Sequence, residues 1–334
     1  MNSPKVSIGI VLFGTKYLKE SLPSLLASDY PNLEIILLDQ EEGVWSAFDL
    51  IWDELPDIAA NPRVKLSKGK NLWHSGGHNV CIQQALRQSS GQAPSDYYIA
   101  GSNDMLYASD CISKLVAALE ESDAGFTAPR LLRWDFDTST KTDYIDSCGL
   151  LATRAQRFTD RGQGRAWEDQ FKKEPVFGAS GALVCFKKSA LEAIQFEQEY
   201  FDELIHYKND VELSYRLNWA GQTCLFVPTA VAWHDRQLAD RGFTARIKAS
   251  RFEKTSSFVG HYILFLKNYS RDFSWQTRLA TAIEMWKRFA FALLFAPYLV
   301  LEFAKLRRSR LDIQDKKTAM KRVTSPADME ALFN

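Results

Sequence analysis

A ten-residue stretch concentrates side chains that could do acid–base chemistry. Tyr207–Arg216 reads YKNDVELSYR, with Asp210 and Glu212 two residues apart and Arg216 four residues after Glu212. An acid at the start of a helix can simply cap it. Held in the same place beside a substrate, it can instead accept a proton from a hydroxyl group. If both acids are helical, they point about 200° apart, which makes Asp210 the candidate base and lets Glu212 orient Arg216.

Two further carboxylates follow segments that have the composition of buried strands. LEIILLD ends in Asp39, and DYYIAG is followed three residues later by Asp104. In open α/β sheets, ligands gather at the carboxyl ends of strands, so both acids are candidates for ligand contact. The structural alternative for Asp104 is a turn-capping acid ahead of a helix.

The elements that must position these acids alternate between strands and helices. VSIGIVLF and LEIILLD are apolar runs typical of buried strands, and LKESLPSLLAS between them has helical spacing. Together they form a βαβ unit, whose crossover is normally right-handed. The pattern continues with a helix near residues 77–88, a strand at 96–101 and a helix at 110–121. We therefore predict an α/β fold with a mostly parallel sheet.

The pattern is less regular after about residue 140. Residues 143–169 are polar and rich in Gly and Arg, which favours a hairpin or a long loop over the sheet. The helix that opens near Asp210, with that residue at its cap, should end near Ala220 because Gly221 follows. TCLFVPTAVAWH has the pattern of edge strands broken by Pro228.

Composition narrows the function classes. Of the 334 residues, 46% are hydrophobic, which allows one large domain with an extension, and 41 basic residues balance 41 acidic ones. No global field would recruit nucleic acid. The five cysteines are scattered without a CxxC pair, so we expect small buried residues rather than a zinc site or a disulfide framework. No basic segment precedes a long apolar run at the N-terminus, so the expected location is the cytoplasm.

The C-terminal part differs in kind. Residues 275–306 have a helical pattern and include FAFALLFAPYLVL, thirteen residues without a charge, flanked by Lys and Arg. This run is shorter than the about 20 residues that a spanning helix needs, and Pro297 interrupts it. Two interpretations stay open. The helix packs on the domain or on a second copy in a homodimer, or it lies in the plane of the inner face of the cell membrane with basic flanks.

Five segments, in chain order, resemble the inverting glycosyltransferases of the GT-A fold, specifically the bacterial rhamnosyltransferase-like branch of glycosyltransferase family 2. They are VSIGIVLFG with LEIILLDQ, NLWHSGGHNVCI, YYIAGSNDMLYASDCI, VFGASGALVCFKKSAL, and FDELIHYKNDVELSYRLNWAGQTCLFVPTAVAWH. With a weaker match at YILFLKN they cover about residues 5–268. The resemblance implies a Rossmann-like GT-A domain over residues 1–245 and a helical extension over residues 246–334.

The resemblance also implies a reaction. A rhamnose-like deoxyhexose would pass from a dTDP- or UDP-sugar to a surface glycan or a lipid-linked saccharide acceptor, with Asp210 as general base. A divalent cation, Mg²⁺ or Mn²⁺, would be held by Asp104 and His234 and would act on the leaving diphosphate. A satisfied structural histidine is the alternative for His234.

Several residues are expected to contact substrate. Asp39 would meet the nucleotide base, and small residues in GASGAL, Ser180 and Gly181 among them, would permit close approach of a sugar or diphosphate. A tight turn ahead of a core strand is the alternative reading of GASGAL. His74 and His78 could meet phosphate or sugar, and Arg236 or Arg241 could clamp the diphosphate. The remaining candidates from the family motifs are Asn71, Gly76, Gly77, Asn79, Glu212 and Arg216.

The sequence departs from the family pattern at named positions. Residues 102–104 read Ser-Asn-Asp and keep one carboxylate, residues 209–212 read Asn-Asp-Val-Glu, and Trp73 and Cys81 replace glycines. The alternative is therefore a catalytically inactive nucleotide-sugar-binding or scaffold subunit of a glycan assembly complex. A sugar nucleotidyltransferase would need a Gly-rich basic loop after the first strand, and FGTKYLKE is a poor match for one.

Overall fold

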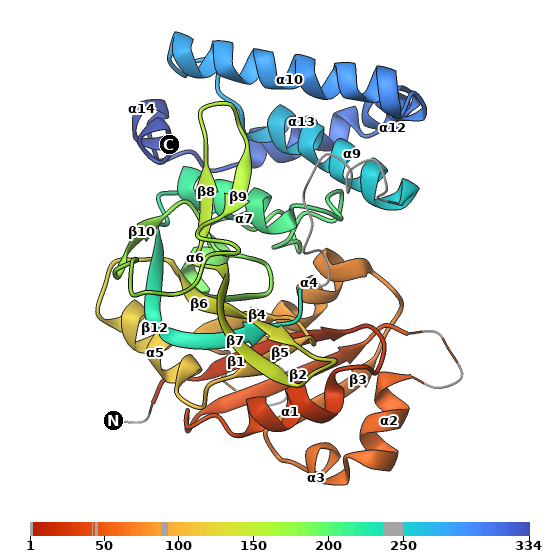
Figure 1. Ribbon diagram of the computed structural model, residues 1–334, viewed down its shortest axis with the longest axis vertical. Helices are drawn as coiled ribbons and strands as arrows, with labels where there is room; N and C mark the ends of the chain where they lie inside the picture. Colours follow the sequence, from red (N-terminus) through yellow and green to blue (C-terminus); the bar gives the residue numbers. More distant parts are fainter. Residues whose placement is uncertain (1–2, 42, 44–45, 88–92, 237–249) are drawn as a thin grey trace.

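The computed structural model describes the chain except for residues 1–2, 42, 44–45, 88–92 and 237–249 (Figure 1). One large sheet runs through the lower half of the molecule, with its strands in the order β10-β12-β6-β11-β4-β1-β2-β3. Its strands are β1 (Val6–Leu12), β2 (Leu33–Asp39), β3 (Val64–Lys68), β4 (Tyr97–Gly101), β5 (Met105–Tyr107), β6 (Phe126–Asp135), β7 (Thr140–Ser147), β10 (Glu174–Val176), β11 (Leu183–Lys187) and β12 (Cys224–His234).

The predicted strands of the N-terminal half are confirmed. β1 pairs in parallel with β2 and with β4, and β2 pairs in parallel with β3. All seven residues of β1 and of β2 are buried, as the continuous apolar runs predicted for strands covered on both faces. The α/β fold with a largely parallel sheet is therefore correct. β11, which follows the GASGAL segment, runs antiparallel to β4 and to β6.

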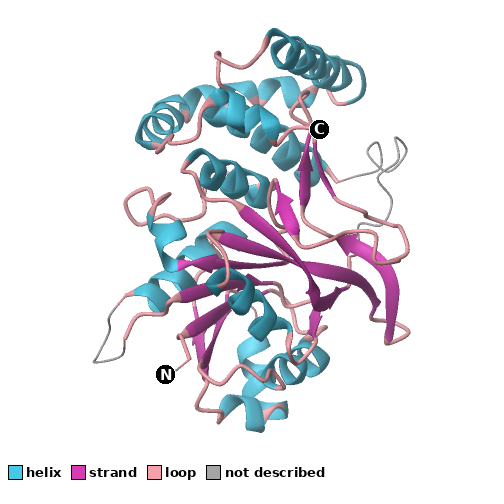
Figure 2. Cartoon of the chain, turned by 90° about the vertical axis from the view of Figure 1, so that its left-hand side faces the viewer, coloured by secondary structure: helices cyan, strands magenta, loops and turns pink. Residues whose placement is uncertain are grey.

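The prediction of broken edge strands around Pro228 is wrong. Residues 224–234 form one long strand, β12, which pairs in parallel with β6 and has β10 and then β5 on its other side (Figure 1). Figure 2 shows the strands of the sheet between helices above and below. Pro228 lies at the register shift between Val227 and Val231. Because proline cannot donate to the ladder, a bulge accommodates it while pairing continues on both sides.

Helices cover both faces of the sheet. One apolar cluster joins α1 (Leu18–Leu26), α2 (Ala47–Glu54) and α5 (Cys111–Glu120) to one face of β1 and β2. A second joins α4 (Trp73–Leu86), α6 (Lys188–Glu192) and α7 (Asn209–Trp219) to the opposite face. The short helix α3 (Pro56–Ala59) packs at the edge near β3. All five cysteines are buried and free, as expected.

The polar segment after β7 forms the predicted hairpin, with β8 (Leu150–Ala152) antiparallel to β9 (Phe158–Asp160). This hairpin projects from the sheet toward the C-terminal helices (Figure 1).

The C-terminal helices stack on α7 rather than on the sheet. They are α9 (Arg251–Asn268), α10 (Trp275–Phe295), α11 (Tyr298–Leu301), α12 (Phe303–Arg308), α13 (Arg310–Ala319) and α14 (Pro326–Ala331). α7 therefore has two buried faces: Leu213 and Leu217 pack toward the sheet, while Val211, Tyr215 and Trp219 pack with the C-terminal part. The predicted boundary between residues 245 and 246 lies outside the described residues, and the division into two domains stays a prediction.

Candidate active site

Strand pairing brings Asp104 and His234 together. Asp104 lies between β4 and β5, and β5 pairs antiparallel with the end of β12, so that Met105 stands opposite His234. The Asp235 N–H donates to the Asp104 carbonyl over 3.1 Å. As a result the Nε2 atom of His234 lies 3.3 Å from Oδ2 of Asp104, although the two residues are 130 positions apart.

A row of alternating charges continues from His234. Its Nδ1 atom lies 2.8 Å from Oδ2 of Asp146, the fully buried acid near the end of β7. The other Asp146 oxygen lies 2.7 Å from Nε of Arg236, and the guanidinium of Arg236 also donates to Asp160 over 2.9 Å. Three carboxylates are thus separated by one imidazole and one guanidinium, an order that lets each charge face opposite neighbours.

The charges in this row shift one another's pKa values. Burial lowers the pKa of His234, but Asp104 and Asp146 outweigh it and raise that pKa to about 10. Burial likewise raises the pKa of Asp146, but His234 and Arg236 hold it below the usual range. Both shifts favour a proton on His234 and a charge on Asp146, so a cation that binds Nε2 of His234 would have to displace that proton.

The pair Asp104 and His234 fits a divalent cation. Two neighbouring ligands of an octahedral ion with bonds of about 2.1 Å lie about 3 Å apart, close to the 3.3 Å between the two donor atoms. Oδ1 of Asp104 is buried and has no hydrogen-bond partner among the described residues. Asp146 holds the other nitrogen of His234, as carboxylates do behind metal-binding histidines. Within the described ranges, no cluster of three or more His, Cys, Asp or Glu side chains could hold a metal ion.

Asp210 is held at the start of α7 by backbone donors. Gly181 N–H donates to its Oδ2 atom over 3.1 Å, and Val211 N–H donates to Oδ1 over 2.8 Å. A Cβ atom on Gly181 would lie 3.3 Å from Cβ of Asp210, so the small residue permits this close approach. Burial raises the pKa of Asp210, and Asp160 raises it further. The residue is half-buried, and its raised pKa makes the carboxylate a stronger base than an ordinary aspartate.

Asp210 is not the helix cap that the sequence suggested. The helix starts at Asn209, and Lys208 occupies the cap position with a left-handed backbone, φ +71°. The side chain of Asn209 contacts Nδ1 of His74 at 2.7 Å. Burial lowers the pKa of His74 to about 4, so this imidazole is neutral beside the candidate base.

Glu212 and Arg216 lie away from the accessible site. Arg216 donates to both oxygens of Glu212 and to the carbonyls of Ile194 and Tyr200, and each side chain is 1% exposed. The expected contact between the two residues is present. Their predicted contact with substrate gives way to a packing role, because the protein encloses them completely.

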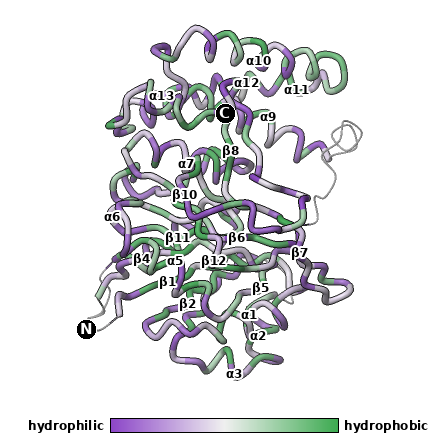
Figure 3. The backbone as a smooth tube through the Cα atoms, turned by 60° about the vertical axis from the view of Figure 1, so that its left-hand side comes forward, coloured by the Kyte–Doolittle hydropathy of each residue, from purple (hydrophilic) through white to green (hydrophobic). Residues whose placement is uncertain are grey.

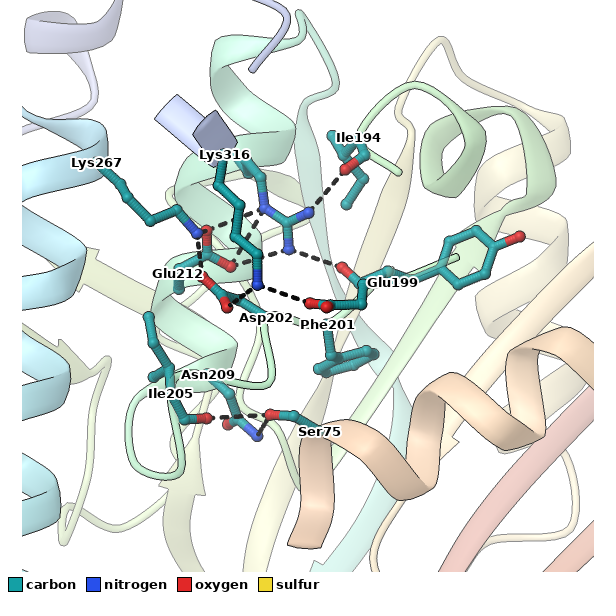
Figure 4. Close-up of polar contacts among 12 residues, drawn as sticks. Ser75, Ile194, Glu199, Phe201, Asp202, Ile205, Asn209, Glu212, Lys267 and Lys316 are labelled. Atoms are coloured by element: carbon teal, nitrogen blue, oxygen red, sulfur yellow. Dashed lines mark hydrogen bonds and ion pairs between the residues drawn. The ribbon is translucent and has the colours of Figure 1, made fainter. Parts of the chain in front are cut away.

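These two residues belong to a buried ion network that joins α7 to the C-terminal helices (Figure 4). Lys267 on α9 donates to Asp202 and, over 2.8 Å, to Glu212. Lys316 on α13 donates to Asp202 and to Glu199 over 2.9 Å and 2.8 Å. The network fixes the segment that leads into α7, and so braces the helix that carries Asp210.

Asp39 and Asn71 lie at the carboxyl edge of the parallel strands, Asp39 as a fully buried residue and Asn71 on the loop ahead of α4. Asp39 ends β2 and accepts backbone N–H groups from Glu41 and Phe48, each over 2.9 Å. Asn71 is exposed and accepts from the Trp73 N–H over 3.0 Å, forming a turn ahead of α4. Each carboxylate oxygen of Asp39 keeps capacity for a second donor.

The candidates on α4 contact protein groups. Asn79 accepts from the N–H groups of Tyr200 and Phe201 and donates to the Phe201 carbonyl and to Glu203. These four hydrogen bonds use the full capacity of the Asn79 amide. A Cβ on Gly77 would lie 2.8 Å from Val11, so this glycine lets α4 approach β1 closely.

Three further candidates, Gly76, Ser180 and His78, also contact protein groups. Gly76 leaves room for Leu72, where a Cβ would approach to 2.7 Å. Ser180 is buried next to Gly181, and its hydroxyl lies 3.5 Å from the Ala182 N–H. His78 is fully buried with Nδ1 2.8 Å from the Tyr98 hydroxyl. Arg241 lies outside the described residues.

Sequence reasoning missed Asp146 and Asp160. Both lie in the stretch predicted only as a hairpin or loop, and each follows a strand residue in a segment of mixed polarity. One signal was present in the sequence. Asp146 lies in YIDSCGLL, among residues that suit a buried strand, and a buried carboxylate needs charged or hydrogen-bonding partners.

No protein-family model matches the sequence, and no curated protein matches it. Solved structures do share its fold. They include a mannosyltransferase from Pyrobaculum calidifontis in complex with GDP-Man and Mn²⁺ (15% identity, TM-score 0.51, 96% of this chain and 86% of that one). They also include GalNAc-T7 with UDP, GalNAc and Mn²⁺ (14%, 0.55, 85% and 55%), and residues 1–349 of S. aureus TarS (12%, 0.52, 98% and 83%).

These likenesses define the architecture of the chain. At 12–15% identity they show the fold alone, and that fold is the GT-A fold of glycosyltransferases. The chain spans 55% of the GalNAc-T7 structure and most of the other two.

Proposed function

We propose that this chain is an inverting, metal-dependent glycosyltransferase that uses a nucleoside diphosphate sugar. One observation carries the proposal. The segment that carries Asp104 is bonded to the segment that holds Asp210: the Ser102 N–H donates to the Ala182 carbonyl over 2.9 Å, and the neighbouring Gly181 N–H donates to Oδ2 of Asp210 over 3.1 Å. Asp160 and Arg236, which end the row of charges that starts at Asp104 and His234, also act on the pKa of Asp210. A candidate base and a candidate metal-binding pair therefore belong to one site, on a fold shared with glycosyltransferases.

Asp210 supplies the proton acceptor in this proposal. The acceptor hydroxyl oxygen forms a bond to the anomeric carbon while the bond from that carbon to the diphosphate oxygen breaks, and the hydroxyl proton passes to the Asp210 carboxylate. Attack opposite the leaving group inverts the anomeric configuration. The N–H groups of Gly181 and Val211 keep the carboxylate in one orientation, so that less freedom is lost on reaction.

Asp104 and His234 would hold the cation, with Asp146 fixing the imidazole. When bound there, the ion would neutralise negative charge on the leaving diphosphate. Two of the structures with similar folds were solved with Mn²⁺, which supports a divalent metal. Asp104 supplies an oxygen that suits Mg²⁺ or Mn²⁺, whereas the imidazole of His234 favours Mn²⁺.

The donor and acceptor are proposed from the sequence resemblance. We infer a rhamnose-like deoxyhexose on dTDP or UDP, with Asp39 near the base, and a surface glycan or lipid-linked saccharide as acceptor. Among the similar structures, one was solved with GDP-Man and another with UDP, so the fold itself accepts more than one nucleotide.

A thermal-shift panel tests the donor site. The purified chain is mixed with dTDP, UDP, GDP or their sugars, each with Mn²⁺ or with EDTA. Stabilisation by a pyrimidine diphosphate that requires metal is the expected result. Stabilisation that is unchanged in EDTA would remove the proposed roles of Asp104 and His234.

The Asp210→Asn variant then separates the two functional candidates. The second candidate is an inactive donor-binding subunit, favoured by the single carboxylate of residues 102–104 and by Asn103, whose amide donates to the Phe13 carbonyl. For an enzyme, the variant should lose about 10²–10⁴-fold in transfer and keep donor binding. A binding subunit would show no transfer with either form.

A further inference from the structure

Helix α10 presents a continuous apolar face to solvent. Apart from Phe295 at its end, its exposed apolar residues recur every three or four positions, so they lie along one side of the 21-residue helix, about 31 Å long. Trp286 is 70% exposed and Leu294 is 75% exposed. The face consists of Trp275, Leu279, Ala282, Ile283, Trp286, Ala290, Leu293 and Leu294. α10 lies at the end of the molecule farthest from the sheet (Figure 1).

The opposite side of α10 is attached to the rest of the chain. Thr277, Thr281 and Ala292 are buried there, and the Thr281 hydroxyl donates to the Arg154 carbonyl of the β8–β9 hairpin over 3.0 Å. The Ser274 hydroxyl at the start of the helix donates to Glu330 over 2.7 Å. These contacts set the rotation of the helix about its axis, so its apolar face points away from the protein.

The exposed charges on α10 itself, Arg278 and Lys287, are both basic. Exposed acids stand at Asp272 before the helix and at Asp312 and Asp315 on α13; between positions 275 and 311 the exposed charged residues that the structure describes are Arg278, Lys287, Arg307, Arg308 and Arg310. The acids of this stretch are withdrawn, since Glu284 pairs with Arg288 over 2.9 Å and Glu302 is buried. Two copies meeting through this face would bring like charges together, whereas an anionic surface would complement them.

We propose that α10 is an in-plane docking helix for an anionic lipid bilayer. Its apolar face would enter the boundary between headgroups and acyl chains, with the two tryptophans at the interface and the basic side chains against the headgroups. Among the described residues, no single helix is long and apolar enough to cross a membrane. Taken together, α10 and residues 298–308 have the length and composition of a membrane span, but the chain bends by 119° between them. Green turns recur along α10 in Figure 3, remote from the apolar strands of the sheet.

This inference does not depend on the chemistry proposed above. It does add to it, because the ion network of Lys267 and Lys316 joins α7 to the C-terminal helices. A bilayer bound at α10 would therefore hold the candidate active site at a set distance from the membrane surface.

Vesicle flotation with the full chain tests the docking helix. Vesicles of phosphatidylcholine with 30–40% phosphatidylglycerol (about one lipid in three) should carry the protein, and pure phosphatidylcholine should carry much less. Leu279→Glu combined with Trp286→Glu should abolish flotation. Trp52→Glu is the matched control, because Trp52 is an exposed tryptophan (52%) on α2, which packs on the sheet far from α10 in the chain.

A second variant removes only charge. Arg278→Gln and Lys287→Gln change exposed side chains and leave the apolar packing intact, so they should fold normally. Each should weaken partitioning about fivefold at low salt, the equivalent of about 1 kcal/mol per basic residue, and the difference should shrink as ionic strength rises.

The opposing outcomes are distinct. No flotation of the wild-type chain with anionic vesicles would overturn the proposal, as would undiminished flotation of the Leu279→Glu, Trp286→Glu variant. A dimer in light scattering that this variant converts to monomer, without vesicle binding by the wild type, would instead identify the face as an interface between two copies.

Discussion

Lys267 and Glu212 form a fully buried ion pair between α9 and α7, with Nζ and Oε1 2.8 Å apart. Glu212 follows Asp210 by two residues on the same helix, and Lys267 also contacts Asp202 in the segment that leads into that helix. The C-terminal helices thus contribute a charge to the interior beside α7, the helix that carries the candidate base.

Replacing Lys267 by methionine should destabilise the fold by about 3–5 kcal/mol. Its removal would leave Asp202 and Glu212 in the interior with one cation fewer, and an uncompensated buried charge is costly. Denaturant unfolding monitored by circular dichroism gives the free energy. Lys321→Met is the control, since Lys321 is an exposed lysine in the same C-terminal region. A loss below about 1 kcal/mol would mean that the network contributes little.

Stability should fall in acid because of Asp202. Burial alone raises the pKa of Asp202, but Lys267 and Lys316 outweigh it and hold the pKa well below the usual range. A depressed folded-state pKa adds stability above the unfolded value of about 3.9, and that stability is lost as pH falls through the folded value. The free energy of unfolding should therefore decrease from about pH 5 downward.

The Asp202→Asn variant checks this assignment. It should be less stable than wild type at pH 7, and the gap between the two should narrow as the pH is lowered. Parallel curves from pH 7 to pH 3 would assign the acid sensitivity to other groups.

The acid side of the activity profile should depend on Asp160. Burial and Asp160 both raise the pKa of Asp210, so kcat/KM should fall on acidification at a higher pH than for an ordinary aspartate. Asp160→Asn removes one negative neighbour and leaves Arg236, which lowers the pKa of Asp210. The acidic limb should therefore move to lower pH. A limb that stays in place would exclude Asp210 as the titrating base.

Metal affinity should depend on Asp146, whose fully buried carboxylate lies against Nδ1 of His234. Asp146→Asn should weaken Mn²⁺ binding about 10–100-fold, because the carboxylate behind a metal-binding imidazole sets its orientation and basicity. Calorimetric titration of the chain with Mn²⁺ measures this directly. Asp143→Asn, at an exposed position on the same strand, is the control. Equal affinities in all three proteins would place the metal elsewhere.

Much of the framework follows from local sequence pattern. The apolar runs of β1 and β2, the helical spacing of α1 and α5, and the end of α7 before Gly221 agree with the structure because periodicity and turn residues act over a few positions. The resemblance in short motifs is enough to name Asp104, His234 and Asp210 as candidates from the sequence alone.

The charged site itself was decided by tertiary structure. Asp146 reaches His234 across 88 positions because β7 and β12 both pair with β6, and no local pattern encodes such a contact. The same holds for Pro228. The local sequence around it predicts an edge strand, but in the folded sheet it lies at a bulge within β12.

Arg216 shows the reverse case. Its spacing from Glu212 was readable in the sequence, but the burial that takes the pair away from substrate depends on Ile194, Tyr200 and the C-terminal helices packing around it. Helical period determines which side chains share a face. Which face is covered, and by what, depends on contacts between distant segments, and only the folded chain settles it.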